Sequence, residues 1–448
     1  MKVLFSNPPW WLEQFTINDN GASHDMCLAG IRAGSRWPHT IHTHSTPDNF
    51  IFGGYLPYPF FMGYATTYAA RATGAQVVMR DSLALRESYA TYFNHLREAN
   101  YRYIFIESAS PSWEHDGQII FAIKKVVPEA RIVVTGPISS KAKEIMENFP
   151  VHAVIKGEYE KGSVRVLEGE EGIIEHDLLT LEEMNGAPFP YYDEVIAHRY
   201  WDDNPRGQSA PHAQVWSSRG CPFKCIFCVW PATMTGNDPD GTGKRSVRHY
   251  TPEYMEAFLS ELTGKYGYSS IYFDDDTFNI GNSHVLKMSE VMKKIGLPWS
   301  AMCRADTSRM ESWKIMRDSG CYGVKLGFES GNQWVVDNIV NKHLDLEHAT
   351  RAVHEIKRLG MTVHGTFTYG LPGETHEQMM DTKRFVASLP LDTWQESGCA
   401  AIEGTPLSNL EEEKVQKAFP GAVADDNYVL EADGAKKWRE LAFTLANS

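Results

Sequence analysis

Cysteine is scarce in this chain, with seven residues among 448. A sparse and odd set of thiols is poorly suited to a disulfide framework, which needs dense and paired cysteines. The chain also lacks any run of eighteen apolar residues, as a membrane-spanning helix would require. Its start, from Met1 to Pro9, is broken by proline too soon for a secretory signal peptide. We therefore expect a cytoplasmic protein without membrane insertion.

Long blocks of one charge are missing as well. The chain has 43 Lys and Arg against 57 Asp and Glu, a net charge of −14 that is spread along the sequence. A protein that binds nucleic acid through phosphate contacts needs a basic face, so we expect no nucleic-acid partner. The length, with 42% hydrophobic residues, suffices for about two or three domains, each with its own core.

Three of the seven cysteines stand close together. Cys221, Cys225 and Cys228 lie in the run Ser-Ser-Arg-Gly-Cys-Pro-Phe-Lys-Cys-Ile-Phe-Cys, which begins at Ser217. Three thiolates can hold three corners of an iron-sulfur cluster and leave the fourth metal open for chemistry. A structural zinc site needs a fourth ligand, and the distance from His212 to Cys221 fits no usual zinc spacing. An iron-sulfur cluster is the favoured interpretation, with structural zinc or inert thiols as alternatives.

The CxxxCxxC spacing, with the aromatic Phe227 just before the last cysteine, resembles the signature of radical S-adenosylmethionine (SAM) enzymes. The resemblance implies that the three cysteines hold a 4Fe-4S cluster whose open iron binds the amino and carboxylate groups of SAM. An electron from the cluster, supplied by an external donor such as flavodoxin or ferredoxin, then cleaves SAM to methionine and a deoxyadenosyl radical. The resemblance also places Phe227 beside the adenine, whereas its sequence context alone is compatible with an ordinary core aromatic.

Before the cysteine loop, apolar runs at residues 2–5, 75–79, 103–106 and 132–134 alternate with stretches able to form helices. This alternation predicts an α/β domain with an open, largely parallel sheet. Ligands of such sheets bind past the carboxyl ends of the strands, where small and glycine-rich loops let a large flat ligand approach the backbone. The candidate binding residues are Asn7, Pro8, Pro9, Ser108, Ser110, Thr135, Gly136, Gly157 and Glu158.

The order of these loops is similar to that of the cobalamin-binding domain that precedes the radical SAM domain in one large subfamily. The Asn-Pro-Pro turn, residues 31–38, residues 55–61 and the later Gly-Pro and Gly-Glu turns carry the resemblance. It implies that residues 1–165 form a Rossmann-like, flavodoxin-like domain that binds cobalamin through the candidate loops. A flavodoxin-like module that only docks against its partner is the alternative.

The DxHxxG motif, which supplies a histidine ligand to cobalt in many cobalamin-binding domains, is missing from the first 165 residues. The lower ligand of cobalt is therefore left open. Histidines that follow the first strand are weak candidates, because solvated surface histidines are common. They are His24, His39, His42 and His44.

Residues 166–210 combine turn formers and charge, which predicts a linker. From 211 to 408, six strands alternate with helices, two units short of a full (βα)8 barrel. A partial (βα)6 TIM-type barrel is also the core that the radical SAM resemblance implies, with the cysteine loop after its first strand. Residues 409–448 predict a short helical extension. The barrel strands are expected at residues 214–218, 269–273, 299–303, 322–328, 362–368 and 393–402, and helices at 252–265, 282–295, 344–359 and 377–389.

Charged residues follow the second and third of these strands, at the end of a barrel where function usually resides. Asp274, Asp275 and Asp276 are consecutive carboxylates, which crowd one another unless a cation or an exposed loop relieves them. The resemblance implies that one of them contacts the SAM amine, and Asp275 is favoured. Arg304 either clamps the SAM carboxylate or forms an ion pair with Asp306.

The fourth and fifth strands lead into two further family-like motifs. Gly-Phe-Glu-Ser-Gly around Glu329 is similar to Gly-Ile-Glu-Ser-Gly, in which the glutamate reaches the SAM ribose. Gly-Leu-Pro-Gly-Glu-Thr, with Gly370 and Gly373, matches the motif that approaches the adenine. The sixth strand departs from the family at Glu403, where proline is usual, and this side chain is a candidate to face substrate.

By resemblance, a cobalamin domain beside a radical SAM barrel implies methylation of an unactivated carbon of a small molecule or natural product through methylcobalamin. The catalytic residues beyond the cofactor ligands stay unknown. Oxidative cyclisation or rearrangement with cobalamin, radical SAM chemistry without cobalamin, and a non-catalytic iron-sulfur electron carrier are the alternatives. A methylthiotransferase would need further cluster cysteines in the N-terminal domain, where only Cys27 is found.

Overall fold

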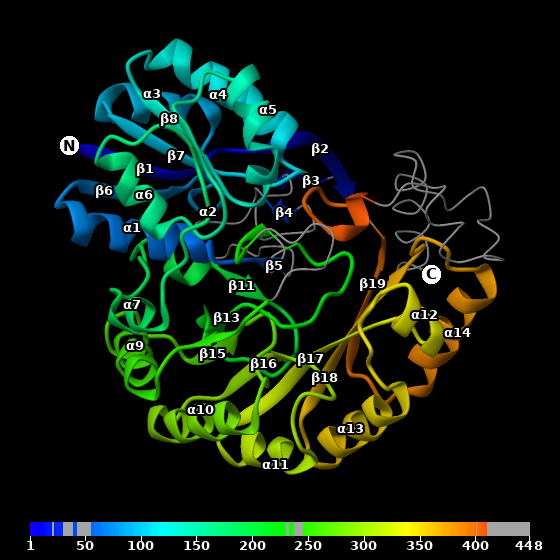
Figure 1. The fold of residues 1–448 in the computed structure, drawn as a ribbon. Helices are drawn as coiled ribbons and strands as arrows, with labels where there is room; N and C mark the ends of the chain where they lie inside the picture. Colours follow the sequence, from blue (N-terminus) through cyan, green and yellow to red (C-terminus); the bar gives the residue numbers. More distant parts are fainter. Residues whose placement is uncertain are drawn as a thin grey trace. The chain divides into compact units, whose positions relative to one another are not determined.

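The computed structural model describes residues 1–19, 22–29, 39–42, 55–229, 233–236, 245–399 and 401–409. The chain divides into two compact units, residues 1–203 with 233–237, and the remainder. The segment predicted as a linker is shared between them, because residues 166–203 belong to the first unit and residues 204–210 to the second. Each unit is described by itself, with the elements labelled as in Figure 1.

The first unit is built on a six-stranded parallel sheet with the strand order β10-β9-β8-β7-β1-β6. Since all six strands run in the same direction, their carboxyl ends lie on one edge. The predicted open parallel sheet is confirmed, and the segment predicted as a linker adds its outermost strand. The strands are β1 (Lys2–Asn7), β6 (Gln76–Asp81), β7 (Tyr103–Glu107), β8 (Arg131–Thr135), β9 (Ala153–Ile155) and β10 (Gly172–Ile174).

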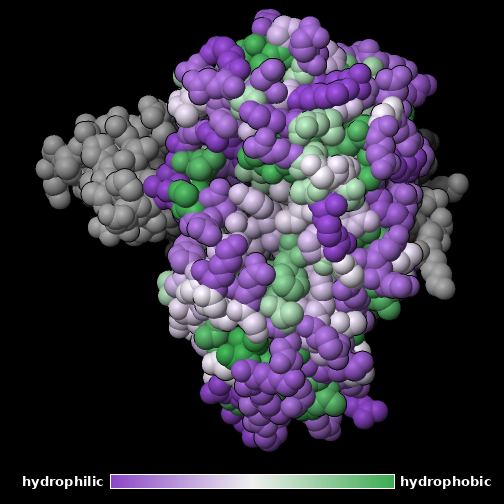
Figure 2. All heavy atoms as spheres, turned by 90° about the vertical axis from the view of Figure 1, so that its left-hand side faces the viewer, coloured by the Kyte–Doolittle hydropathy of each residue, from purple (hydrophilic) through white to green (hydrophobic). Residues whose placement is uncertain are grey.

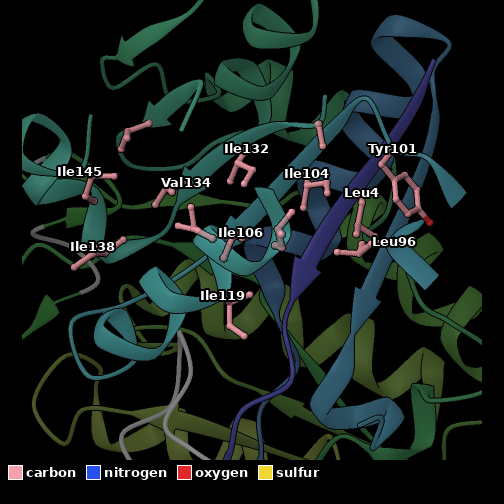
Figure 3. Packing of buried hydrophobic residues seen from close by; sticks show 14 of the residues in the cluster. Leu4, Leu96, Tyr101, Ile104, Ile106, Ile119, Ile132, Val134, Ile138 and Ile145 are labelled. Atoms are coloured by element: carbon pink, nitrogen blue, oxygen red, sulfur yellow. The ribbon is translucent and has the colours of Figure 1, made fainter. Parts of the chain in front are cut away.

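Alternate residues of the central strands pack on opposite faces of this sheet. On one face, Leu4, Ile104 and Ile132 belong to a buried cluster with residues of helices α3 and α4 (Figure 3). On the other face, Phe5 stacks on the neighbouring Phe105 with ring centroids 4.3 Å apart. Burying one such side chain is worth roughly 1.5–3 kcal/mol, so both faces stabilise the sheet that carries the loops.

The helices of the first unit begin and end at local signals. For example, the Ser88 side chain accepts from the backbone N–H of Thr91 at the start of α3, and Asn100 ends it in the left-handed region. The helices are α1 (Phe60–Thr73), α2 (Ser82–Leu85), α3 (Tyr89–Ala99), α4 (Trp113–Val126), α5 (Ala142–Asn148), α6 (Glu160–Leu167) and α7 (Leu181–Gly186), with short 3-10 turns at Pro137–Lys141 and Ala197–Arg199.

Two small antiparallel sheets, which the sequence did not predict, also belong to the first unit. They comprise β2 (Trp11–Asp19), β3 (Ala22–Ala29) and β4 (His39–His42), and β5 (Tyr55–Leu56) paired with β11 (Trp201–Asp202). Several predictions fall outside what the structure describes: residues 31–38, His44 and the side chains of Cys27, His24, His39 and His42.

Aromatic residues fix the segment before residue 203 to the first unit. Tyr192 stacks on Tyr58 with centroids 4.6 Å apart, and Tyr200 meets the same ring edge-on. The Tyr200 hydroxyl donates to Asp81 Oδ2 over 3.1 Å. This part of the predicted linker is therefore packed against the first unit.

The second unit contains a six-stranded parallel sheet whose strands follow one another in sequence order, β12-β15-β16-β17-β18-β19 (Figure 1). The sheet and the helices between its strands confirm the predicted partial barrel. The strands are β12 (His212–Val215), β15 (Ser270–Phe273), β16 (Trp299–Cys303), β17 (Cys321–Glu329), β18 (Thr362–Tyr369) and β19 (Thr393–Gly398), with β13 (Ser218–Arg219) and β14 (Arg248–His249) as an antiparallel pair.

Local capping also sets the helices of the second unit. Thr375 and Gln378 form a reciprocal capping box at the start of α14. The helices are α9 (Pro252–Gly264), α10 (Asn282–Ile295), α11 (Met310–Asp318), α12 (Gln333–Asn338), α13 (Leu346–Arg358) and α14 (His376–Ser388), with a 3-10 turn at Pro406–Asn409. The predicted extension beyond residue 409 lies outside the described residues.

The surface carries no sign of a membrane span. Over the ranges that the structure describes, none of the helices combines the length and the apolar composition needed to cross a bilayer. On the face drawn in Figure 2, hydrophilic side chains predominate and hydrophobic ones form small separate groups.

Candidate functional site

The cysteine loop follows β13 in the second unit. Cys221 is buried, and Cys225 and Cys228 are partly buried. The Cys228 N–H donates to the Cys225 carbonyl over 3.1 Å, which closes a tight turn between the last two cysteines. The loop is tied to the rest of the unit by Ile226, whose N–H donates to the Val340 carbonyl over 3.1 Å.

The donor chemistry of this loop suits an iron-sulfur cluster. Burial, with a smaller effect of the nearby Asp276, raises the pKa of the Cys221 thiol to about 11, and burial also raises that of Cys225. Binding of a metal must therefore displace protons. Within the described ranges, no three His, Cys, Asp or Glu side chains converge on a single ion. Zinc gathers its ligands around one ion, whereas a cluster takes its thiolates on separate irons.

Asp275, which we predicted to contact the SAM amine, is buried at 2% exposure. Its carboxylate accepts from the backbone N–H and the hydroxyl of Ser217, over 3.1 and 2.9 Å, and from the hydroxyl of Ser218. Burial outweighs these hydrogen bonds and raises the pKa of Asp275 to about 7. The protein contacts of this carboxylate thus point to the stem of the cysteine loop.

Arg304 forms the ion pair that we considered as the alternative to SAM binding. Its Nε and Nη2 donate to the Asp306 carboxylate over 2.5 and 3.0 Å, and Nη2 also reaches the Lys342 carbonyl over 2.6 Å. The guanidinium lies over the ring of Phe223, 3.8 Å from its centroid. Because Phe223 is part of the cysteine loop, this cation–π contact holds the loop against the barrel.

Glu329 ends β17 in the left-handed region, with a φ of 69°. Lys342 donates to Glu329 Oε1 over 2.8 Å, and both side chains are about nine-tenths buried. A Cβ at Gly327 would lie 2.6 Å from Glu329 Oε1 and 2.8 Å from Lys342 Nζ, so a larger residue there would displace the ends of these two side chains. The sequence analysis missed Lys342, because a lysine in an Asn-Lys-His loop carries no sign of burial.

The loop after β18 meets the cysteine loop through apolar contacts. Phe227 packs against a buried cluster that includes Leu371, the residue next to Gly370. Gly370 and Gly373 have φ values of 70° and 84°, which give this loop its sharp path. Burial raises the pKa of Glu374 in the same loop to about 8, and its Oε1 finds no hydrogen-bond partner among the described residues.

At the carboxyl edge of the first unit's sheet, two predicted cobalamin-binding residues present polar atoms without partners. Asn7 Nδ2 and Ser110 Oγ are buried, and neither has a hydrogen-bond partner within the described part of the chain. Pro8 and Pro9 lie buried beside Asn7. A buried donor that lacks a partner costs about 1–3 kcal/mol, and a polar ligand would remove this cost.

Other predicted residues at this edge are engaged within the protein. Ser108 Oγ donates to Asp116 Oδ2 over 2.6 Å, and Thr135 Oγ1 lies 3.3 Å from the Ile106 carbonyl. Gly136 has a φ of 89°, and a Cβ there would lie 2.5 Å from the Ser108 carbonyl. These residues shape the edge. Asp116 was missed, because its position in a helix carries no motif.

Gly157 and Glu158 hold another segment of the chain. The Glu158 N–H donates to the Met234 carbonyl over 2.8 Å, and His176 Nε2 lies 3.1 Å from the Thr233 carbonyl. A Cβ at Gly157 would lie 2.5 Å from the His176 ring and 2.9 Å from the Met234 carbonyl. Residues 233–236, shortly after the last cysteine in sequence, therefore cover this loop of the first unit. The sequence analysis gave no indication of this contact.

Comparison with known proteins gave consistent matches. Residues 217–386 match the family model described as the Radical SAM superfamily. An uncharacterized methyltransferase of Pyrococcus horikoshii is 29% identical over 323 residues, which cover 67% of each chain. The cytidylyl-2-hydroxyethylphosphonate methyltransferase of Streptomyces wedmorensis is 29% identical over 212 residues, 44% of this chain but only 38% of the relative.

A solved structure shares the fold over most of the chain. The radical SAM methyltransferase TsrM from Kitasatospora setae, with cobalamin and a [4Fe-4S] cluster bound, matches with a TM-score of 0.61 at 16% identity. The match covers 79% of this chain and 71% of TsrM. At this identity the likeness shows a common fold, and it agrees with the predicted combination of a Rossmann-like sheet and a partial barrel.

Proposed function

We propose, from the match of residues 217–386 to the Radical SAM superfamily, that this chain is a cobalamin-dependent enzyme that methylates an unactivated carbon of a small molecule. The family match confirms the prediction of an enzyme that uses SAM and a 4Fe-4S cluster. The single observation that carries the proposal is the cysteine loop, which places three thiols within eight residues and is tied to the barrel unit through Ile226.

In this proposal Cys221, Cys225 and Cys228 bind the cluster, and the cluster with SAM supplies the radical. The residues of the chain hold and orient these groups. Glu329, kept in place by Lys342 over 2.8 Å, accepts hydrogen bonds from the ribose hydroxyls. Phe227 and the loop of Gly370 and Gly373, which meet through Leu371, enclose the adenine. We assign Arg304 to holding the loop rather than SAM, because Asp306 already binds its guanidinium.

The proposed cobalamin site lies at the carboxyl edge of the first unit's sheet. Asn7 Nδ2 and Ser110 Oγ, which lack partners among the described residues, would donate to the amide oxygens of the corrin side chains. Ser108, Thr135 and Gly136 shape this edge. Gly157 and Glu158 are reassigned to holding residues 233–236, because their space and N–H are used by that segment. The cobalamin bound by TsrM, which shares this fold, supports the assignment.

Methyl transfer is supported by the names of the relatives, two of which are methyltransferases. Cobalamin supplies the methyl group in such a reaction, and an external flavodoxin or ferredoxin would supply the electron. The substrate is a small molecule whose identity is left open.

The test is anaerobic reconstitution of the whole chain with iron, sulfide and hydroxocobalamin, followed by desalting and incubation with SAM and dithionite. We expect retained corrinoid absorbance, release of deoxyadenosine, and formation of S-adenosylhomocysteine as SAM donates methyl groups. Absence of deoxyadenosine would point to the electron-carrier alternative. Loss of all corrinoid on desalting would indicate a radical SAM enzyme without cobalamin. Deoxyadenosine without S-adenosylhomocysteine would favour cyclisation or rearrangement.

A further inference from the structure

Asp275 anchors the stem of the cysteine loop. One carboxylate oxygen, Oδ1, accepts from the Ser217 backbone N–H over 3.1 Å, from its hydroxyl over 2.9 Å and from the Ser218 hydroxyl. Ser217 Oγ also lies 2.9 Å from His284 Nε2. Because the serine gives its proton to Asp275, the histidine must donate from Nε2. The carboxylate thus fixes the two residues that lead into the loop.

Asp276 and Thr277, the two residues after Asp275, contact Gly220 and Cys221 of the cysteine loop. Asp276 Oδ2 accepts from the Gly220 N–H over 3.0 Å, directly before the first cysteine. The Thr277 hydroxyl lies 3.6 Å from Cys221 Sγ, within hydrogen-bond range for sulfur. Three consecutive residues therefore hold consecutive parts of the cysteine loop and its stem. We call Asp275, Asp276 and Thr277 the clamp.

We propose that the clamp is a positioning element for the cluster: it holds Cys221 in place before iron binds, and Thr277 donates a hydrogen bond to the Cys221 thiolate afterwards. This role differs from the SAM contact that the sequence suggested for Asp275. The inference rests on the proposed placement of the cluster on Cys221, Cys225 and Cys228.

The chemistry of Thr277 explains the second half of the inference. Its hydroxyl has one proton, which it gives to the Asp276 carbonyl over 2.6 Å while Cys221 is a thiol. A thiolate is a stronger acceptor than a carbonyl, so ligation of iron turns the hydroxyl toward the sulfur. Hydrogen bonds to cluster sulfurs raise the reduction potential, because they stabilise the more negative reduced cluster.

The first arm of the test compares Asp275→Asn with the neighbouring Asp274→Asn. Asp274 is half-buried and is the neighbouring carboxylate, so its replacement removes the same charge. Each protein is reconstituted anaerobically with limiting iron, and iron per chain is measured together with the EPR signal of the reduced cluster without SAM. We expect Asp275→Asn to load iron about 10-fold more weakly, as is typical when groups that orient metal ligands are lost, and Asp274→Asn to load like the wild type.

The second arm changes only the hydrogen bond to sulfur. Thr277→Val removes the hydroxyl with little change in shape, and Thr277→Ser keeps it. We expect a lower midpoint potential for Thr277→Val in an anaerobic redox titration, restoration by Thr277→Ser, and thermal unfolding midpoints close to the wild type for both. This arm stays informative if Asp275→Asn does not fold.

The outcomes separate the clamp from the placement of the cluster. If the wild type binds no iron on the three cysteines, the placement is wrong. If the wild type binds a cluster while Asp275→Asn loads equally well and Thr277→Val keeps the wild-type potential, the clamp is overturned and the proposed function stands. Equal losses in Asp274→Asn and Asp275→Asn would also overturn the clamp, because they would reflect the loss of charge alone.

Discussion

The two units differ in how the polar groups at their strand ends are satisfied. At the barrel rim, Asp275, Arg304 and Glu329 are each bound to other protein groups within about 3 Å. At the edge of the first unit's sheet, Asn7 Nδ2 and Ser110 Oγ are buried without a partner among the described residues. These three charged groups at the barrel rim have protein partners, whereas these two donors at the sheet edge have none among the described residues.

This difference suggests two ways of preparing a cofactor site. A cluster needs thiolates held at fixed positions. The charged groups of the barrel rim accordingly bind the cysteine loop and the residues around it. A large ligand with many amide groups supplies acceptors of its own, and buried donors without protein partners gain most from it. Four experiments test this comparison.

The largest effect is expected at the cysteines. Replacing Cys221, Cys225 or Cys228 by alanine should reduce cluster content and deoxyadenosine release to background, because each removes a ligand that the loop cannot replace. Iron, sulfide and deoxyadenosine are measured after anaerobic reconstitution. The control is Cys321→Ala, a buried free thiol at the start of β17, which should keep its cluster. A full cluster in any variant of the triad would contradict the placement.

The second effect concerns the buried ion pair between Lys342 and Glu329 at the barrel rim. Lys342→Met leaves the buried Glu329 carboxylate without its cation, and the free energy of unfolding should fall by about 3–5 kcal/mol. The double variant Glu329→Gln with Lys342→Met should recover most of this loss, because no uncompensated charge remains. Chemical denaturation measures both.

A matched control for this pair lies on the surface of α11. Lys314 and Asp318 form an exposed ion pair four residues apart, and Lys314→Met should cost less than about 0.5 kcal/mol. If Lys342→Met costs no more than this control, the rim is not held by its internal pairs.

Much of the second unit could be predicted because its signals are local. Helix α10 and strand β16 were predicted to the residue, since glycines flank the helix and the apolar pattern of the strand is unbroken. Asp275, which follows β15 directly after Asp274, is instead held by long-range contacts. Its partners, Ser217 and Ser218, could not be predicted, because they lie almost sixty residues away in sequence and are brought near only by the pairing of β12 with β15.

Strand β10 of the first unit was not predicted, for the same physical reason. β10 has three residues, Gly-Ile-Ile, and becomes a strand because β9 offers it an edge. Lys342 and residues 233–236 acquire their roles from contacts with distant parts of the chain, so their own sequence carries no motif. Roles that depend on a distant tertiary partner could therefore not be assigned from sequence alone.

The third effect is a dependence of stability on pH caused by Glu374. Burial raises its pKa from 4.5 to about 8, so the folded state binds the proton more tightly than the unfolded chain. The stabilisation from this group is complete below pH 4.5 and is lost as the pH rises to about 8. A shift of this size corresponds to a few kcal/mol. Glu374→Gln should flatten the pH profile of the free energy of unfolding, while Glu377→Gln in the exposed first turn of α14 should leave it unchanged.

The smallest effect gives the sharpest comparison, because two serines at one loop differ only in their partners. Ser108→Ala removes the donor to Asp116 and should lower the free energy of unfolding by about 1–3 kcal/mol. Ser110→Ala removes a buried hydroxyl without a described partner, so it should not lower the free energy of unfolding and should raise it by up to about 1–3 kcal/mol. Its affinity for hydroxocobalamin, measured by absorbance titration, should nevertheless fall by up to about 10-fold, the value of one hydrogen bond. Equal stability losses in the two variants, with unchanged corrinoid affinity, would show that the Ser110 hydroxyl does not bind the corrinoid.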